Sequence, residues 1–110
     1  DQSQYLASSL HELGSVLLKR RAQGDLSQAL TILSKAATIR ERRPGKKSLA
    51  FAASMHQIGQ AHLHMNFSHE AKLYLTGALA LRERLVGKHS AQAAASRAAL
   101  GIATANLGEF

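Results

Sequence analysis

Hydrophobic positions recur along the chain at the spacing of an α-helix. The leucines from Leu6 to Leu17 follow one another at steps of three or four residues, which places them on one helix face. Four later segments show the same period, and no window alternates strictly between apolar and polar residues as a half-buried strand would. We therefore predict an all-α protein. Its five helices are expected at about 3–22, 26–42, 48–65, 66–87 and 90–107.

Turn-forming residues separate these helices. Gly24 is a candidate left-handed stop after the first helix, and Pro44 with Gly45 ends the second. The candidate N-caps, whose side chains can accept amide protons of a first helical turn, are Asp25 or Ser27, Ser48 and Ser90. All loops are short, so no linker divides the chain, and we expect one domain over residues 1–110.

Two stretches of the chain repeat each other at a spacing of 42 residues. The pattern Ala-x3-Leu-x2-Ala-x2-Ile-Arg-Glu-Arg-x2-Gly-Lys at 29–46 returns at 71–88 with leucine for isoleucine, and residues 7–14 match 52–59 and, more weakly, 94–101. A period in this range indicates a stacked solenoid. We expect a fragment of a longer solenoid or two repeats closed by a capping helix. The predicted units are repeat 1 at about 3–44, repeat 2 at about 46–87, and a half repeat or capping helix at about 89–110.

The aligned positions resemble the tetratricopeptide repeat. In that family a bulky residue and a small residue end the first-helix motif, and the second helix reads Ala-x3-bulky-x2-Ala. Leu13-Gly14 with residues 29–36, and Ile58-Gly59 with residues 71–78, follow this pattern. The long period and the loop Gly87-Lys88-His89-Ser90 are similar to the kinesin-light-chain type. The resemblance implies a right-handed α-α superhelix of about two and a half repeats.

The first repeat is longer than the second near its internal turn. Gly14 and Ala29 are 15 residues apart, whereas Gly59 and Ala71 are 12 apart. Because three to four residues make one turn of helix, we expect about one additional helical turn around residues 19–21. That turn would project basic side chains beyond the edge of the stack.

The resemblance also implies that the first helix of each repeat lines a concave groove. We expect this groove to capture a peptide with an acidic residue, held by polar and cationic donors, and with an apolar anchor near Leu63 and Ile102. His11 and His56 can equally be half-exposed residues beside the core. The candidate groove residues are His11, Ser15, Lys19, His56, Gln60, Leu63, His64, Ile102 and Asn106.

The charge of the chain leaves a second class of partner open. The sequence holds 14 lysines and arginines against 7 acidic residues, a net charge of +7, which favours an acidic protein or nucleic acid. Cations at helix C-termini also complement the helix dipole, and few aromatic residues are available to stack bases. A third alternative is self-assembly through the apolar face of the last helix, giving a homo-oligomer. The candidate basic rim is Arg20, Arg21, Arg40, Arg42, Arg43, Lys46 and Lys47.

Several chemistries find no support in these residues. The absence of cysteine removes disulfides, zinc-thiolate sites and cysteine nucleophiles, and no phosphate loop or hydrolase motif is present. His62 and His64 stand two apart and point in different directions on a helix, and we expect His62 to be a neutral, hydrogen-bonded core residue. No apolar run is long enough to span a bilayer. We predict a non-catalytic cytoplasmic adaptor or scaffold that needs no cofactor and no metal.

Overall fold

The computed structural model describes residues 2–109, and residues 1 and 110, the two ends of the predicted domain, lie outside this range. All five predicted helices are present, and residues 2–109 contain no strand. A kinked turn, η1 (Glu41–Gly45), in which Arg43 is extended, follows the second helix. The all-α prediction is therefore confirmed. The helices are α1 (Gln2–Arg20), α2 (Asp25–Arg40), α3 (Leu49–His64), α4 (Ser68–Val86) and α5 (Ala91–Asn106).

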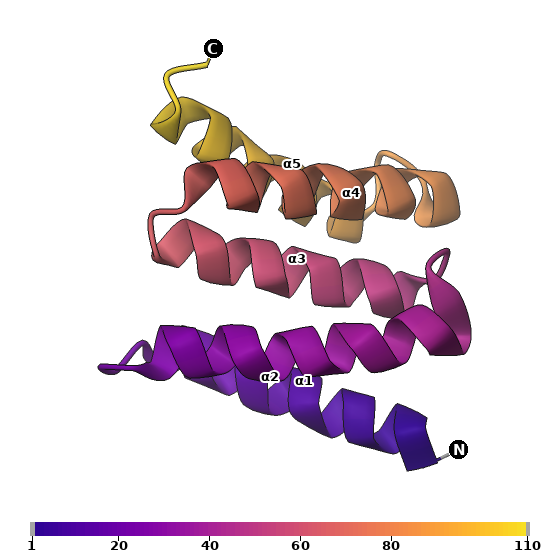
Figure 1. Ribbon diagram of the computed structural model, residues 1–110. Helices are drawn as coiled ribbons and strands as arrows, with labels where there is room; N and C mark the ends of the chain where they lie inside the picture. The colour runs from indigo at the N-terminus through magenta and orange to yellow at the C-terminus, as the bar shows by residue number, and fades with distance from the viewer. Residues whose placement is uncertain (1, 110) are drawn as a thin grey trace.

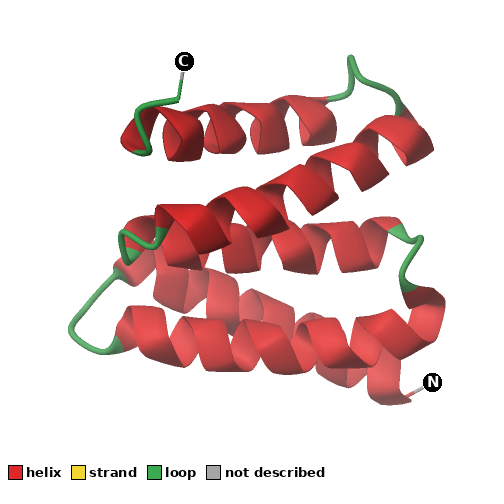
Figure 2. Cartoon of the chain, turned by 45° about the horizontal axis from the view of Figure 1, so that its top comes forward, coloured by secondary structure: helices red, strands yellow, loops and turns green. Residues whose placement is uncertain are grey.

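The helices stack in the order of the chain. Each packs mainly against its neighbours in sequence, α1 on α2, α2 on α3, α3 on α4 and α4 on α5. Figure 1 shows the two chain ends at opposite ends of this stack, and the turned view in Figure 2 shows the same separation. The stack is flat, with principal extents of 43 × 36 × 19 Å. This arrangement is the superhelical stacking that the repeat pattern predicts.

The core consists of two hydrophobic clusters, and each joins three consecutive helices. The small and bulky positions of the repeat pattern, such as Ala29 with Leu33 and Ala71 with Leu75, are fully buried in them. The first cluster contains Leu17, Leu18, Ala29, Leu33, Ile58 and Ala61. The second contains Leu63, Ala71, Leu75, Ala99 and Ala103. Neighbouring repeats therefore share their core rather than each enclosing one.

Glycine allows the two helices of each repeat to approach closely. A Cβ atom at Gly14 would lie 2.5 Å from Cγ of Leu33, and one at Gly59 would lie 2.7 Å from Cγ of Leu75. Real Cβ atoms do not pack at such distances, so the leucine occupies the space that a side chain would need. The predicted close contact at these two glycines is confirmed.

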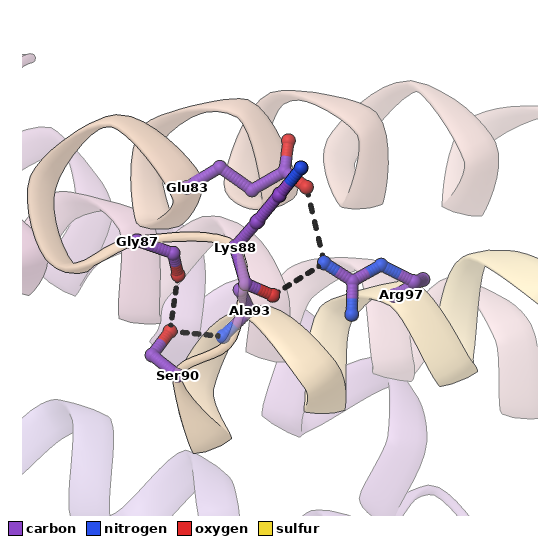
Figure 3. A network of polar contacts seen from close by, with 6 residues as sticks. All are labelled: Glu83, Gly87, Lys88, Ser90, Ala93 and Arg97. Carbon is purple, nitrogen blue, oxygen red and sulfur yellow. Dashed lines mark hydrogen bonds and ion pairs between the residues drawn. The ribbon is translucent and has the colours of Figure 1, made fainter.

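Serine caps begin α3 and α5 in the same way. Ser48 Oγ accepts a hydrogen bond from the Phe51 amide at 3.1 Å and donates to the Gly45 carbonyl at 2.7 Å. Ser90 repeats this arrangement with Ala93 and Gly87, at 3.1 and 2.8 Å (Figure 3). Both predicted serine caps are confirmed.

The start of α5 is also tied to the end of α4 by a long side chain. Arg97 Nη2 donates to Glu83 Oε2 at 3.0 Å and to the Lys88 carbonyl at 2.8 Å, as Figure 3 shows. The ion pair is solvent-exposed and therefore weak. It closes the α4–α5 loop without burying a charge.

The α1–α2 connection differs from the prediction in its cap. Gly24, with φ of 84°, is the residue before α2, and no side chain caps this helix. Asp25 is instead a buried first residue whose carboxylate accepts hydrogen bonds from Arg20 Nε at 2.7 Å and from the Ala22 amide at 2.9 Å. The predicted cap by Asp25 or Ser27 is therefore wrong, because the Asp25 carboxylate turns back to close the loop.

The predicted additional helical turn in the first repeat is also wrong. The three additional residues are distributed: α1 runs one residue further past Gly14 than α3 does past Gly59, the loop 21–24 is one residue longer than 65–67, and α2 begins one residue earlier. Arg21 and Asn66, with φ of 52° and 64°, follow the two helices in left-handed conformation. The insertion therefore widens the whole turn slightly instead of lengthening one helix.

Candidate functional site

A polar hollow lies between α1 and α3, the first helices of the two repeats. Its volume is about 170 Å³. Four predicted groove residues, two from each helix, come together in its wall. The lining residues are Ser15, Leu18, Lys19, Arg21, Gln57, Gln60 and His64. The hollow is the place where the predicted groove residues converge.

Hydrogen bonds join the two sides of the hollow. Gln57 Nε2 on α3 donates to Ser15 Oγ on α1 at 2.8 Å. Because the Ser15 oxygen is the acceptor in this bond, its own hydrogen can still be donated to a ligand. Arg21 Nη1 lies 3.4 Å from His64 Nδ1, and a guanidinium can only donate, so this nitrogen of His64 is the acceptor.

The electrostatics of the hollow favour an anion. Lys19 and Arg21 contribute two cations, and none of its described lining residues is acidic. Burial, and secondarily the charge of Arg21, lower the pKa of His64, which therefore stays neutral at neutral pH. An entering carboxylate would meet charge-assisted donors without a competing negative group.

Two predicted groove residues lie in the core instead. His56 is 9% exposed, with Nδ1 2.9 Å from Ser96 Oγ, and Leu63 is 7% exposed within the second hydrophobic cluster. Their predicted exposure is wrong because α3 is covered by neighbours on more sides than α1, which ends the stack. Neither side chain can contact a ligand in this arrangement.

The other predicted groove residues are separate from the hollow. His11 is half-buried, and its Nδ1 lies 3.1 Å from Arg40 Nη1. On α5, Ile102 is 53% exposed and Asn106 is exposed at the helix end, but neither is among the lining residues. The structure thus brings together Ser15, Lys19, Gln60 and His64 and leaves these three apart.

The predicted basic rim divides into two groups. Arg40 is half-buried between helices, and Arg20 binds the buried Asp25 carboxylate, so neither is a plain surface cation. For Arg40 the prediction of a rim position is wrong, because its guanidinium reaches back into the α2–α3 junction. Like Arg20, the other five rim residues are exposed: Arg21, Arg42, Arg43, Lys46 and Lys47.

The role of Arg40 belongs to a repeated contact that sequence reasoning missed. Arg40 Nη1 donates to Ser54 Oγ at 3.0 Å and to the Ala50 carbonyl at 3.2 Å. Arg82 makes the same two bonds, to Ser96 Oγ at 3.0 Å and to the Gln92 carbonyl at 3.2 Å. We call each set, Arg40 with Ser54 and Arg82 with Ser96, an arginine–serine clamp. The signal was available, because both the arginine and the serine recur at the repeat spacing.

A histidine completes each clamp. Burial, and secondarily the neighbouring arginines, lower the pKa of His11 and of His56 to about 4. Arg82 donates to the Ser96 oxygen, and His56 Nδ1 lies 2.9 Å from the same oxygen. The neutral imidazole accepts the serine hydrogen in one tautomer and donates to the second oxygen lone pair in the other. Each clamp thus joins two neighbouring helices across a junction between repeats.

His62 differs in part from its predicted environment. It is half-buried and its ring stacks on Tyr74, with centroids 5.4 Å apart, while Phe67 lies at 6.2 Å. Burial lowers its pKa, as expected for a neutral imidazole. Its Nδ1 has no hydrogen-bond partner, however, so ring stacking holds the side chain rather than the predicted hydrogen bond.

Residues 2–109 contain neither a candidate metal site nor a membrane-spanning helix. No group of three or more histidine, cysteine or acidic side chains there is arranged to hold a metal ion. No helix in the same range is long and apolar enough to cross a membrane.

Comparison with known protein families gives a match over part of the chain. Residues 51–92 match the family described as Tetratricopeptide repeat. The matched segment contains nearly all of α3, the whole of α4 and the beginning of α5. The comparison with curated proteins found no match to the chain.

Proposed function

We propose that the chain is a tetratricopeptide-repeat protein, as the match of residues 51–92 to that family supports, and that it binds a peptide with an acidic residue in the hollow between α1 and α3. Tetratricopeptide repeats generally mediate protein–protein interaction. In this proposal the chain is a non-catalytic scaffold, and its specificity comes from the side chains that the first helices present.

The observation that carries the proposal is the combination of donors in the hollow. Lys19 and Arg21 supply positive charge, and Gln60 and the Ser15 hydroxyl supply neutral donors. A volume of about 170 Å³ suits one side chain rather than a whole helix. An aspartate or glutamate of an extended peptide therefore fits as the anchoring residue, with the remainder of the peptide lying along the surface.

The net charge of +7 supports the same choice of partner. Long-range attraction raises the association rate of acidic ligands, although it does not select among them. Selection would come from the hollow itself. We therefore expect affinity to depend both on ionic strength and on the identity of the lining residues.

The proposal can be tested by selecting ligands from a displayed library of random peptides. The selected peptides should share an acidic residue, and Lys19→Glu/Arg21→Glu should weaken their binding by about tenfold or more in fluorescence anisotropy, since two charge-assisted contacts become repulsive. Lys35→Glu/Arg84→Glu, at exposed positions of α2 and α4, is the matched control, because it changes the net charge by the same amount outside the hollow.

Three results would contradict the proposal. In the first, the selected peptides lack acidic residues; in the second, the variant in the hollow and the control variant bind them equally well. In the third, the chain binds a single-stranded oligonucleotide more tightly than the peptides, through Arg42, Lys46 and Lys47. The affinity for the oligonucleotide then falls steeply with salt and does not change when Lys19 is substituted. That outcome would assign the function to the basic rim.

A further inference from the structure

An apolar stripe runs along the solvent-exposed surface of α1. Leu6, Leu13 and Val16 are 54%, 49% and 57% exposed, and Ser9 is exposed between them. Their spacing of three, four and three residues places all four side chains on one helix face. We call these four residues the α1 stripe. Such a row of large apolar side chains in water marks a surface that binds another apolar surface.

The same stripe exists on α3 and α5, where it is covered. The residue types follow the same order in all three helices, apolar, serine, apolar and apolar, at shifts of 45 and then 42 residues. Of the equivalents, only Phe51 and Leu100 are half-buried, and the others are buried. The equivalent residues are Phe51, Ser54, Ile58 and Ala61 on α3, and Ala93, Ser96, Leu100 and Ala103 on α5.

In both cases the covering element is the helix that precedes in the stack. On α3, Ile58 and Ala61 share a core cluster with residues of α2, and Ser54 accepts its hydrogen bond from Arg40. On α5, Ala103 shares a cluster with residues of α4, and Ser96 accepts from Arg82. The stripe is therefore one half of a repeated interface, and the other half is an amphipathic helix with an arginine in or just before its last turn.

We infer that the α1 stripe is the docking face for a further repeat, whose second helix lies on Leu6, Leu13 and Val16 and donates an arginine hydrogen bond to Ser9. The occupant has the character of α2 and α4, with small and leucine side chains toward α1 and an arginine near its C-terminus. The inference rests on continuity with the two interfaces already present. It is independent of the hollow, since no stripe residue lines it.

The chain contains the probe that tests this inference. A copy of residues 25–47 is joined directly before Ser3, so that the copied Lys47 precedes Ser3 as Lys47 precedes Ser48 in the natural chain. The added helix should dock on the stripe and raise Tm by about 5 °C or more, in proportion to the interface gained. Hydrogen exchange should show protected amides in the added segment.

Substitutions then locate the contact. Leu13→Asp should remove the gain in Tm from the extended chain while leaving the Tm of the unextended chain nearly unchanged, because Leu13 is exposed there. Leu73→Asp, at an exposed position of α4, is the matched control and should preserve the gain. Ser9→Ala and replacement of the copied Arg40 by alanine should each reduce the gain, with little further loss when they are combined.

The inference fails if the extended chain has the same Tm and an unprotected added segment. It also fails if Leu73→Asp abolishes the gain as fully as Leu13→Asp does. The third contradicting result would come from sedimentation of the unextended chain. A dimer that dissociates on Leu13→Asp would show that a second copy, and not a repeat helix, covers the stripe.

Discussion

The two arginine–serine clamps use the same arginine and serine positions but place the histidine differently. At the α2–α3 junction, His11 Nδ1 faces Arg40 directly at 3.1 Å. At the α4–α5 junction, His56 Nδ1 faces the serine, at 2.9 Å from Ser96 Oγ. The arginine makes the same two hydrogen bonds, at the same distances, in both junctions. The geometry between repeats is therefore set by arginine, serine and a backbone carbonyl. The histidine adapts to the space that remains.

The largest difference in stability is expected between substitutions at two equivalent glycines, Gly59 on α3 and Gly101 on α5. Gly59→Leu places its Cβ within 3 Å of two Leu75 atoms and should destabilise the chain by roughly 2–3 kcal/mol or more. Gly101→Leu meets no atom within 4 Å of its Cβ and should stabilise by about 0.5–1 kcal/mol through helix propensity. Urea unfolding measures both. Equal losses would show that α5 is packed as tightly as α3.

A smaller difference in stability is expected between the two clamps when the arginine of each is removed. Arg40→Met removes contacts to His11, Ser54 and the Ala50 carbonyl, whereas Arg82→Met removes contacts to Ser96 and the Gln92 carbonyl. We expect losses of about 1.5–3 kcal/mol, larger for Arg40, because hydrogen bonds from a charged donor are involved. Chemical denaturation of the two variants tests the order. A larger loss for Arg82 would place the main restraint at the second junction.

Near neutral pH, the smallest effect is the pH dependence of stability that the histidines impose. The folded pKa of His56 is about 4 and its unfolded pKa is near 6.5, so the unfolded chain binds the proton first and stability falls as pH decreases between these values. The contribution is about 1 kcal/mol between pH 7 and about 5.5 and approaches about 3 kcal/mol over the whole interval. His56→Gln should flatten the fall in Tm from pH 7 to 4.5, while His89→Gln, in an exposed loop, should not. Identical slopes in both variants would contradict a neutral His56 in the clamp.

The fold follows from the sequence because its determinants are local and repeated. The glycine at position 14, the serine caps and the alanine and leucine positions act within one repeat, so spacing alone predicts their role. The environments of individual side chains are harder to predict from the sequence. His56 and Leu63 were expected in the groove, and only the packing of α3 among its neighbours places them inside.

Charged residues were the hardest to place. A run of arginines suggests a solvated surface, yet Arg40 reaches a serine 14 residues away and Arg20 turns to a buried carboxylate. Composition carries no information on which cation finds a partner, since that depends on the turn between the helices. The hollow shows the opposite case, because Ser15, Lys19, Gln60 and His64 meet as the helix register predicts, and their role in binding stays a prediction.

The clamps also bear on how the chain reaches its folded state. Each joins an arginine and a serine only 14 residues apart, across one turn. Most helix contacts likewise link elements adjacent in sequence, so little loop-closure entropy opposes the search for native contacts. A chain built this way folds rapidly and can begin at either junction, and the completed junction then provides the template on which the next helix orders.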